Sequence, residues 1–293
     1  LADAHTPGPM ERGSGLNAET RGTNDLSTQP THVHMKIPTM AELQADGRQP
    51  EILFWVGCAG SFDSRAQKVS VAFATILNEA GVDFAILGQE ESCTGDPARR
   101  AGNEFLFQMQ ALQNIETLNG YGVSRIVTTC PHCFNTLRNE YPELGGSFEV
   151  VHHTTYLQQL IDEGRITVEG GVFEGKTLTY HDSCYLGRVN GIYEAPRALL
   201  SQFENELREM PRCGSNGLCC GAGGAQMFKE DEPGHSRINT ERVNEALATG
   251  AGVVAVNCPF CLTMMEDGVK GSDKQDEVMV LDISELIVNN LQK

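Results

Sequence analysis

The fold is decided by Glu51-Ile-Leu-Phe-Trp-Val-Gly-Cys58, a short apolar run that ends at a glycine and a cysteine. An apolar run of this length is typical of a strand buried on both faces of a parallel sheet. Ser124–Thr128, before Cys130, and Val253–Val256, before Cys258, have the same form. Because parallel sheets bind ligands beyond the carboxyl ends of their strands, we expect these cysteines at a binding edge.

Nine of the ten cysteines form a pattern that occurs twice. In each copy the second cysteine position follows the first by 35 residues, and a C-P-x-C pair follows 37 residues later in one copy and 39 in the other. The first set is Cys58, Cys93, Cys130 and Cys133, and the second is Cys184, Cys219, Cys220, Cys258 and Cys261. Such matched spacings are hard to obtain by chance, and gathered thiolates indicate a bound metal centre.

Strand and helix patterns alternate through both copies. In the first copy the predicted strands are 51–56, 82–87, 124–128 and 148–152, and the predicted helices are 64–80, 101–119 and 154–163. In the second copy the strands are 176–181, 207–210, 253–256 and 277–281, and the helices are 194–204, 235–249 and 283–291. The alternation predicts an α/β fold of two tandem, pseudo-symmetric Rossmann-like halves with parallel sheets and cysteine sites at the carboxyl ends of strands.

The texture of the sequence also divides the chain. Residues 1–34 are rich in polar residues, glycine and proline without periodicity, and we expect a disordered leader there. The expected parts after it are an N-terminal extension at 35–50, a first cysteine-rich copy at 51–164, a linker at 165–175 and a second copy at 176–293.

Composition excludes several classes of function. The net charge of −17 opposes binding to nucleic acid, whose phosphates would be repelled. No apolar run approaches the roughly 20 residues that span a bilayer. The cysteines are clustered and not spread as disulfide staples, so the reducing cytoplasm is the expected compartment. An acidic chain also favours a partner with a basic docking face.

The two cysteine sets differ in the metal centre that they can hold. Four thiolates suit a tetrahedral zinc ion or a [4Fe–4S] cluster equally well, whereas zinc has no use for a fifth. The adjacent Cys219 and Cys220 cannot easily face one small ion, because consecutive side chains diverge. The loop after them contains Gly221, Gly223 and Gly224, which let backbone amides approach and donate to a bulky cluster.

The pattern resembles the cysteine-rich CCG domain of the heterodisulfide reductases and of related glycolate- and lactate-oxidation iron–sulfur subunits. The resemblance covers about 51–291. It rests on Tyr180-His-Asp-Ser-Cys184-Tyr-Leu-Gly-Arg188 and Cys219-Cys-Gly-Ala-Gly-Gly224 in the second copy, and on Glu91-Ser-Cys-Thr-Gly-Asp-Pro-Ala-Arg-Arg-Ala-Gly-Asn-Glu104 in the first. The family implies a redox role. Complete copies hold noncubane [4Fe–4S] clusters on five cysteines, and in heterodisulfide reductase these split a disulfide by one-electron steps.

The first copy departs from this family at Thr94, which stands where the motif has its second adjacent cysteine. The resemblance therefore implies a noncubane cluster at the Cys184 set, and a four-thiolate [4Fe–4S] cluster or zinc at the Cys58 set. Some relatives with a weakened first copy carry zinc. Disulfide cleavage that needs two equivalent clusters is not expected here.

Other polar residues have less decisive contexts. His181 precedes Cys184 by three residues and is a candidate for a hydrogen bond to a cluster or substrate, or for packing; no other catalytic residue is identified. His152 and His153 are expected to cap a helix. Arg99 and Arg100 follow the Cys93 loop, where a cation offsets thiolate charge. The tenth cysteine, Cys213, is expected to be incidental.

These features predict an iron–sulfur electron-transfer subunit of a multi-subunit oxidoreductase, exchanging electrons with a quinone, thiol or disulfide, or flavin partner. The chain has no ferredoxin motif of its own. Its expected partner is a ferredoxin-type or flavoprotein subunit, associated with a membrane, which would hold the chain peripherally on the inner face. The rival hypotheses are a self-contained thiol/disulfide reductase and a nonredox structural zinc protein.

Overall fold

The apolar run before Cys58 forms β1 (Ile52–Trp55), all four residues of which are buried. The computed structural model describes residues 36–169, 171–173, 175–230 and 233–291. The expected leader at 1–34 lies outside these residues. The sheet of the first copy has the order β2-β1-β3-β4, and all its strands are parallel. Its other strands are β2 (Phe84–Ala85), β3 (Arg125–Thr128) and β4 (Glu149–His152).

Helices connect these strands in the right places for a doubly wound sheet. The helices of the first copy and of the extension before it are α1 (Met40–Ala45), α2 (Gly57–Phe62), α3 (Ser64–Glu79), α4 (Asp96–Arg100), α5 (Glu104–Gly120), α6 (Pro131–Asn135) and α7 (His153–Asp162). Side-chain oxygens begin the longer ones: Asp63 accepts from the backbone of α3, and Asn103 accepts from that of α5. Such N-caps satisfy amides that would otherwise lack partners.

The second copy repeats the order with a smaller, parallel sheet, β5-β6-β7. Its elements are β5 (Leu178–Tyr180), α8 (Glu194–Leu200), α9 (Ile238–Ala248), β6 (Val253–Val256), α10 (Pro259–Gly271), β7 (Met279–Asp282) and α11 (Ile283–Val288). The predicted α/β fold of two Rossmann-like halves is therefore confirmed.

One predicted strand of the second copy is wrong. Residues 207–210 make only an isolated parallel bridge, between Leu207 and Leu178. Beyond it, Arg208 pairs with Glu206, and Glu209 pairs with Arg197 of α8. These polar contacts take the segment away from the sheet edge, so the second sheet has no full counterpart of β2.

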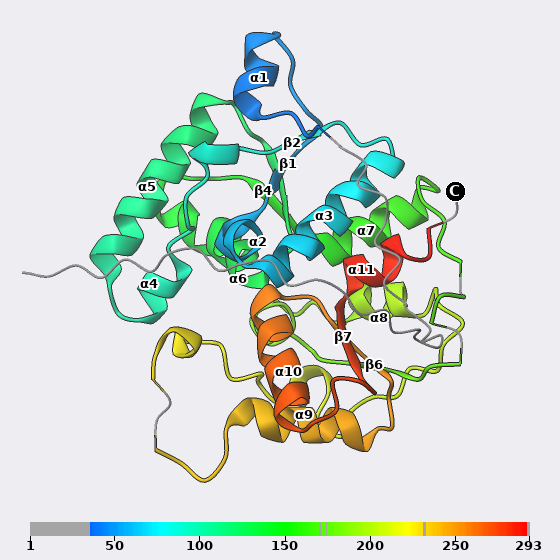
Figure 1. Ribbon diagram of the computed structural model, residues 1–293. Helices are drawn as coiled ribbons and strands as arrows, with labels where there is room; N and C mark the ends of the chain where they lie inside the picture. Colours follow the sequence, from blue (N-terminus) through cyan, green and yellow to red (C-terminus); the bar gives the residue numbers. More distant parts are fainter. Residues whose placement is uncertain (1–35, 170, 174, 231–232, 292–293) are drawn as a thin grey trace, which may run out of the picture. The chain divides into compact units, whose positions relative to one another are not determined.

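The two copies pack about a pseudo-twofold axis. Helix α3 follows the first strand of its copy and packs against α11, which follows the last strand of the other copy. The equivalent pair, α8 and α7, also packs together, and the four helices lie side by side in Figure 1. Arg65 of α3 ties the copies by binding Glu285 of α11 at 2.7 Å, Glu266 of α10, and the backbone oxygen of Val280 at 2.9 Å.

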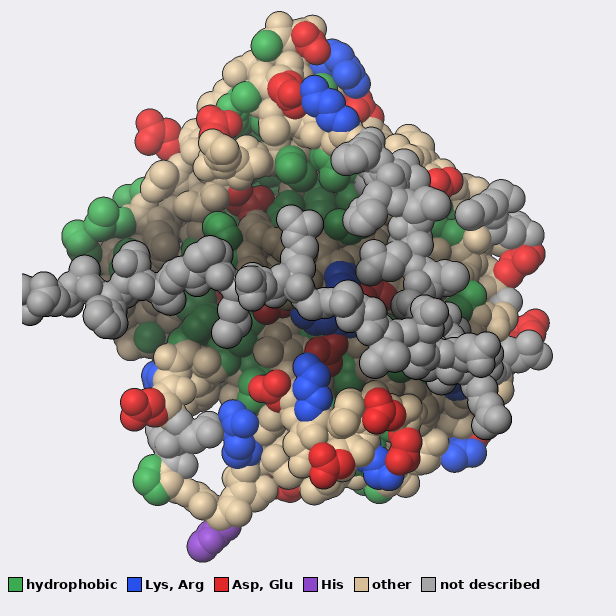
Figure 2. All heavy atoms as spheres, viewed as in Figure 1, with side chains coloured by type: hydrophobic (Ala, Val, Ile, Leu, Met, Phe, Trp, Pro, Cys, Tyr) green, Lys and Arg blue, Asp and Glu red, His purple; other side chains and the backbone are tan. Residues whose placement is uncertain are grey.

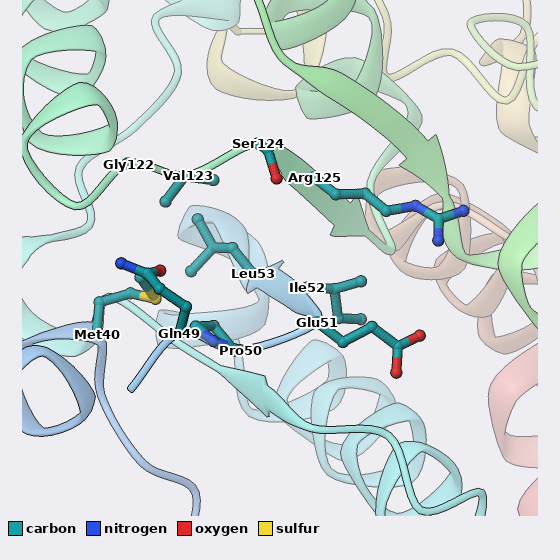
Figure 3. Close-up of a pocket in the computed structure, with 10 residues that line it drawn as sticks. All are labelled: Met40, Gln49, Pro50, Glu51, Ile52, Leu53, Gly122, Val123, Ser124 and Arg125. Atoms are coloured by element: carbon teal, nitrogen blue, oxygen red, sulfur yellow. The ribbon is translucent and has the colours of Figure 1, made fainter. Parts of the chain in front are cut away.

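The cysteine-bearing edge is the buried one. A single apolar core cluster contains Trp55 and Phe134 from the first copy and Phe260 and Met264 from the second, together with five of the cysteines. At the opposite edge, a cavity of about 180 Å³ lies by the amino-terminal ends of β1 and β3 (Figure 3). It contains no cysteine, and ligands of parallel sheets bind at the other edge. None of the described helices is long and apolar enough to cross a bilayer.

Candidate metal centre

The lone cysteine of each copy lies just beyond its first strand. Cys58 is in the first turn of α2, directly after Gly57, and Cys184 follows β5 by four residues. Gly57 has a φ of +79°, and a Cβ there would lie 3.4 Å from the Cys133 sulfur. The Gly-Cys pair therefore turns the chain sharply and brings the backbone close to a second cysteine.

Each C-P-x-C motif begins a helix. Cys130 is the N-cap of α6 and Cys258 is the N-cap of α10, and a proline follows each at the first helical position. Proline is favoured there because its fixed φ suits a helix and its missing N–H is not needed. The arrangement turns both cysteines of each motif toward the carboxyl ends of β3 and β6, where the sets assemble.

The middle loops of the two copies have the same backbone shape. Gly95 has a φ of +89° and Gly221 a φ of +91°, in Cys93-Thr-Gly95 and Cys219-Cys-Gly221 respectively. A Cβ at Gly95 would lie 2.8 Å from the Phe107 ring, so only glycine fits. Thr94 and Cys220 occupy equivalent positions, and each is 2% exposed.

The four thiols of the first set approach one another in pairs. Cys58 contacts Cys93, and Cys130 contacts Cys133. The hydroxyl of Thr94 lies 3.9 Å from the Cys133 sulfur, on the side where the second copy has a fifth thiol. No three of these four sulfur atoms, all of which are described, lie within 4.8 Å of one another.

The five thiols of the second set form a continuous series of contacts. Cys184 contacts Cys219, which contacts Cys220; Cys220 contacts Cys261, which contacts Cys258. The structure therefore gathers all five predicted ligands. The predicted glycine donors are in part nearby: the amide of Gly221 lies 3.3 Å from the Cys219 sulfur and that of Gly223 also points to it. Gly224 makes no described contact with a cysteine.

The two sets adjoin each other, which the repeated spacing does not predict. The thiol of Cys130 contacts that of Cys258, although 128 residues separate them in the chain. Both follow inner strands of their sheets, β3 and β6, which the pseudo-twofold axis brings together. The available signal was the shared position of the two C-P-x-C motifs, but spacing along a chain carries no measure of how the copies pack.

Contacts between thiols move their pKa values apart. The hydrogen bond with Cys58 lowers the pKa of Cys93 to about 7, against the effect of burial. Hydrogen bonds with Cys184 and Cys220 hold the pKa of Cys219 far below its usual range. One thiol of each set is therefore disposed to ionise first, as a metal ligand must.

His181 is fully buried beside the second set. One of its ring nitrogens lies within 4.8 Å of the sulfur atoms of Cys220 and Cys261. Its Nδ1 accepts a hydrogen bond from the Nε of Arg242 at 2.9 Å, and its Nε2 has no partner among the described residues. Burial and the Arg242 charge lower the pKa of His181 to about 4, so the ring is neutral at pH 7.

The arginines after the Cys93 loop do not meet thiolates directly. They end α4 and do not begin it, and cations at a helix C-terminus suit its dipole. Arg99 and Arg100 both bind Glu140, and Arg100 also binds Asp96 at 3.0 Å. Asp96 in turn holds Nδ1 of His132, inside the first C-P-x-C motif, at 3.0 Å.

Two further acidic and aromatic contacts were missed in the sequence. The carboxylate of Glu91 accepts from the amides of Val56, at 3.1 Å, and Gly57, at 2.5 Å, and so fixes the turn that carries Cys58. Burial raises the pKa of Glu91 to about 7. The ring of His132 stacks on Tyr185, with centroids 4.1 Å apart, which joins the first C-P-x-C motif to the Cys184 loop.

The remaining polar candidates lie away from the thiols. His152 is the N-cap residue of α7 but its side chain makes no capping bond; its Nδ1 pairs with the Thr154 hydroxyl at 2.8 Å. His153 lies 3.2 Å from Asp282 of the other copy. Cys213 makes no described contact with the other cysteines, and its half-exposed position agrees with an incidental thiol.

The donor set fits the iron–sulfur cluster that the resemblance implies. Zinc holds sulfur at about 2.3 Å in a tetrahedron, which places its thiolates about 3.8 Å apart, and it takes four ligands. The second set has five thiols and, beside them, a buried ring nitrogen without a partner among the described residues. Gly221 at a φ of +91° removes a side chain there. Such a site suits an object larger than one ion.

A family profile of the cysteine-rich CCG domain matches residues 52–138 and 178–266. The chain therefore belongs to the cysteine-rich CCG-domain family, and it carries two copies of that domain. The matched ranges fall within the two halves of the fold, one on each sheet.

Named relatives are longer than this chain. It is 46% identical over 257 residues to the probable iron-sulfur-binding oxidoreductase FadF of Bacillus subtilis, covering 87% of this chain and 36% of that protein. It is 43% identical over 251 residues to the EtfAB:quinone oxidoreductase of Syntrophomonas wolfei, covering 84% and 35%. With one subunit of the dihydromethanophenazine:CoB–CoM heterodisulfide reductase of Methanosarcina barkeri it shares 35% over 251 residues, covering 82% and 59%.

A solved structure shares the fold. The crystal structure of a hypothetical protein from Helicobacter pylori aligns with a TM-score of 0.53 at 10% identity, over 83% of this chain and 49% of that one. At this identity the likeness concerns the fold alone.

Proposed function

We propose that this chain is an iron–sulfur electron-transfer module of an oxidoreductase complex. The observation that carries the proposal is the gathering of five thiols at the second set, including both members of the adjacent pair, Cys219 and Cys220. In this proposal Cys184, Cys219, Cys220, Cys258 and Cys261 hold a [4Fe–4S] cluster of the noncubane type. A bound cluster supplies one-electron transfer.

The first set holds a centre of a different kind. Thr94 offers a hydroxyl where Cys220 offers a thiol, so four thiolates remain. Their sulfur atoms are spaced more widely than the roughly 3.8 Å of a tetrahedral zinc site, which favours a four-thiolate [4Fe–4S] cluster over zinc. Because Cys130 contacts Cys258, the two centres are close neighbours, and an electron passes between them without a third cofactor.

The acceptor that we favour is a quinone, reached through a partner. The relatives with the higher identities are named as an iron–sulfur oxidoreductase and a quinone oxidoreductase, and the heterodisulfide reductase subunits are more distant. A further relative, 44% identical over 250 residues, is named as a probable membrane-anchored ferredoxin. A membrane-held redox partner would place this chain at a membrane surface.

The first experiment measures the metal content of protein purified without oxygen. We expect about four irons and four sulfides per filled cluster, brown colour and an EPR signal in one oxidation state. Cys220→Ser should remove or reshape the signal of the second centre and leave the first centre filled. Cys213→Ser is the matched control and should change nothing. Zinc without sulfide, or an unchanged spectrum in Cys220→Ser, would contradict the assignment.

Helix α5 offers a docking face for the electron donor. Its inner side holds the Cys93 loop, where Asn114 donates to the backbone oxygen of Cys93 at 3.0 Å. Its outer side exposes four apolar side chains, and Figure 2 shows hydrophobic atoms along the edge where α5 lies: Phe105, Leu106, Met109 and Leu112. We propose that a ferredoxin-type protein, or an equivalent domain in the longer relatives, covers this face, one helix diameter of about 10 Å from the first centre.

A transfer assay tests this face. Phe105→Ser and Met109→Ser should slow reduction by a reduced [4Fe–4S] ferredoxin, because both side chains, 76% and 54% exposed, project from the same side of the helix. Val71→Ser, at a 62% exposed position on α3, is the control. Strong slowing by salt with no effect of the α5 substitutions would instead favour docking through the acidic surface.

A further inference from the structure

The tautomer of His181 is determined by its neighbour. A guanidinium can only donate hydrogen bonds, and the Nε–H of Arg242 points at Nδ1 of His181 from 2.9 Å. Nδ1 must therefore offer its lone pair, which leaves the proton of the neutral ring on Nε2. The reverse tautomer would bring two N–H groups face to face. Nε2 consequently has no free lone pair, and His181 is not a metal ligand.

The Nε2–H has no acceptor among the described residues. It is fully buried, although buried donors in folded proteins are nearly always paired. The ring nitrogen beside the second set is within 4.8 Å of the sulfur atoms of Cys220 and Cys261. The missing acceptor therefore belongs in the space that these thiols enclose.

Arg242 is held rigidly for this task. Its side chain is fully buried in α9, where Nη1 donates to the backbone oxygen of Arg212 and to the carboxylate of Glu245, both at 2.7 Å. Glu245 also binds the Arg212 side chain. These contacts fix the guanidinium, which fixes the ring of His181 against rotation.

The equivalent position of the first copy has the same property. Trp55 precedes Cys58 by three residues, as His181 precedes Cys184. Trp55 pairs in register with Thr128, two residues before Cys130, and His181 is level with the residue two before Cys258. The indole Nε1 of Trp55 is also buried without an acceptor among the described residues, and an indole N–H can only donate.

We propose that His181 is a positioning residue that donates its Nε2–H to a sulfur atom of the centre held by the Cys184 set, with Arg242 fixing the donor. The proposal rests on the proposed function, since it needs a centre in that set. A hydrogen bond to sulfur stabilises the more negative, reduced state more than the oxidised one, so this donor raises the reduction potential. The role is distinct from ligation and from proton transfer.

The test is a redox titration of anaerobically purified protein, followed by EPR. In His181→Phe the reduction equilibrium of the second centre should fall about tenfold, which is about 59 mV toward negative potential for a one-electron couple. His181→Gln, whose amide can still donate, should recover most of the shift. Arg212→Gln is the matched control, because it removes a cation from the same network but leaves the donor in place.

A second readout does not need the cluster. Long-range ¹H–¹⁵N NMR of the metal-free protein should show His181 as the Nε2–H tautomer, and Arg242→Met should produce a mixture of tautomers. Unchanged potential in His181→Phe with the centre filled, or an Nδ1–H tautomer in the unmodified protein, would overturn the inference. Failure of the unmodified protein to take up iron and sulfide would instead refute the proposed function, while the tautomer would still report on Arg242.

Discussion

A methyl group added at Gly95 tests whether the shape of the Cys93 loop is what builds the first site. Gly95 and Gly102 have nearly the same backbone, with φ values of +89° and +87°. An alanine at either position incurs the cost of a left-handed conformation, about 1–2 kcal/mol. At Gly102 a Cβ meets nothing within 4 Å, whereas at Gly95 it lies 3.2 Å from backbone atoms of Phe107, which cannot rotate away.

The difference between the two variants therefore isolates the packing effect. Overpacking of a buried site costs about 1–3 kcal/mol, so Gly95→Ala should lose about 2–5 kcal/mol of unfolding free energy and Gly102→Ala only about 1–2. Because α5 cannot recede without moving Cys93, the first site should also lose metal in Gly95→Ala while the second stays filled. Denaturant unfolding and metal analysis measure both effects. Equal destabilisation by the two substitutions would refute this explanation of the loop.

Two further outcomes follow from contacts elsewhere in the fold. Arg65→Met leaves Glu285 and Glu266 without their shared cation between the copies and should cost about 3–5 kcal/mol in denaturant unfolding, whereas Arg48→Met, which breaks an exposed pair with Asp83, should cost about 0–1; similar losses would contradict the bridging role. Thr94→Cys adds a fifth thiol beside Cys133 and should make the EPR spectrum of the first centre approach that of the second; two identical spectra before the substitution would show that Thr94 does not distinguish the sites.

The sequence was most informative where burial is simplest. β1 and β6 are buried along their whole length, so each appears as an unbroken apolar run, and their positions were predicted within a residue or two. The prediction of a strand at 207–210 failed because its charged side chains find partners off the sheet. Local pattern reports burial well, but it does not report which long-range ion pair wins.

The same limit explains what could be foreseen of the site. The cysteines were found because their spacing repeats, and spacing is visible in a sequence. The contact between Cys130 and Cys258 and the bond from Arg242 to His181 join residues 128 and 61 positions apart. Both depend on how one element packs against another. Neither Arg242, in an ordinary amphipathic helix, nor Asp96, in a short one, carried a local signal of its role.

Equivalent positions of the two copies agree in the scaffold and differ at the centres, so that one frame holds two different sites. Both middle loops turn at a glycine with φ near +90°, and both C-P-x-C motifs cap a helix. The positions that face the centres differ, with Thr94 against Cys220 and Trp55 against His181. A change in the frame would displace several ligands at once, whereas a change of a facing side chain alters one contact with the centre. Two neighbouring centres of unequal potential are therefore the expected product of this arrangement, and unequal potentials give electron flow between them a direction.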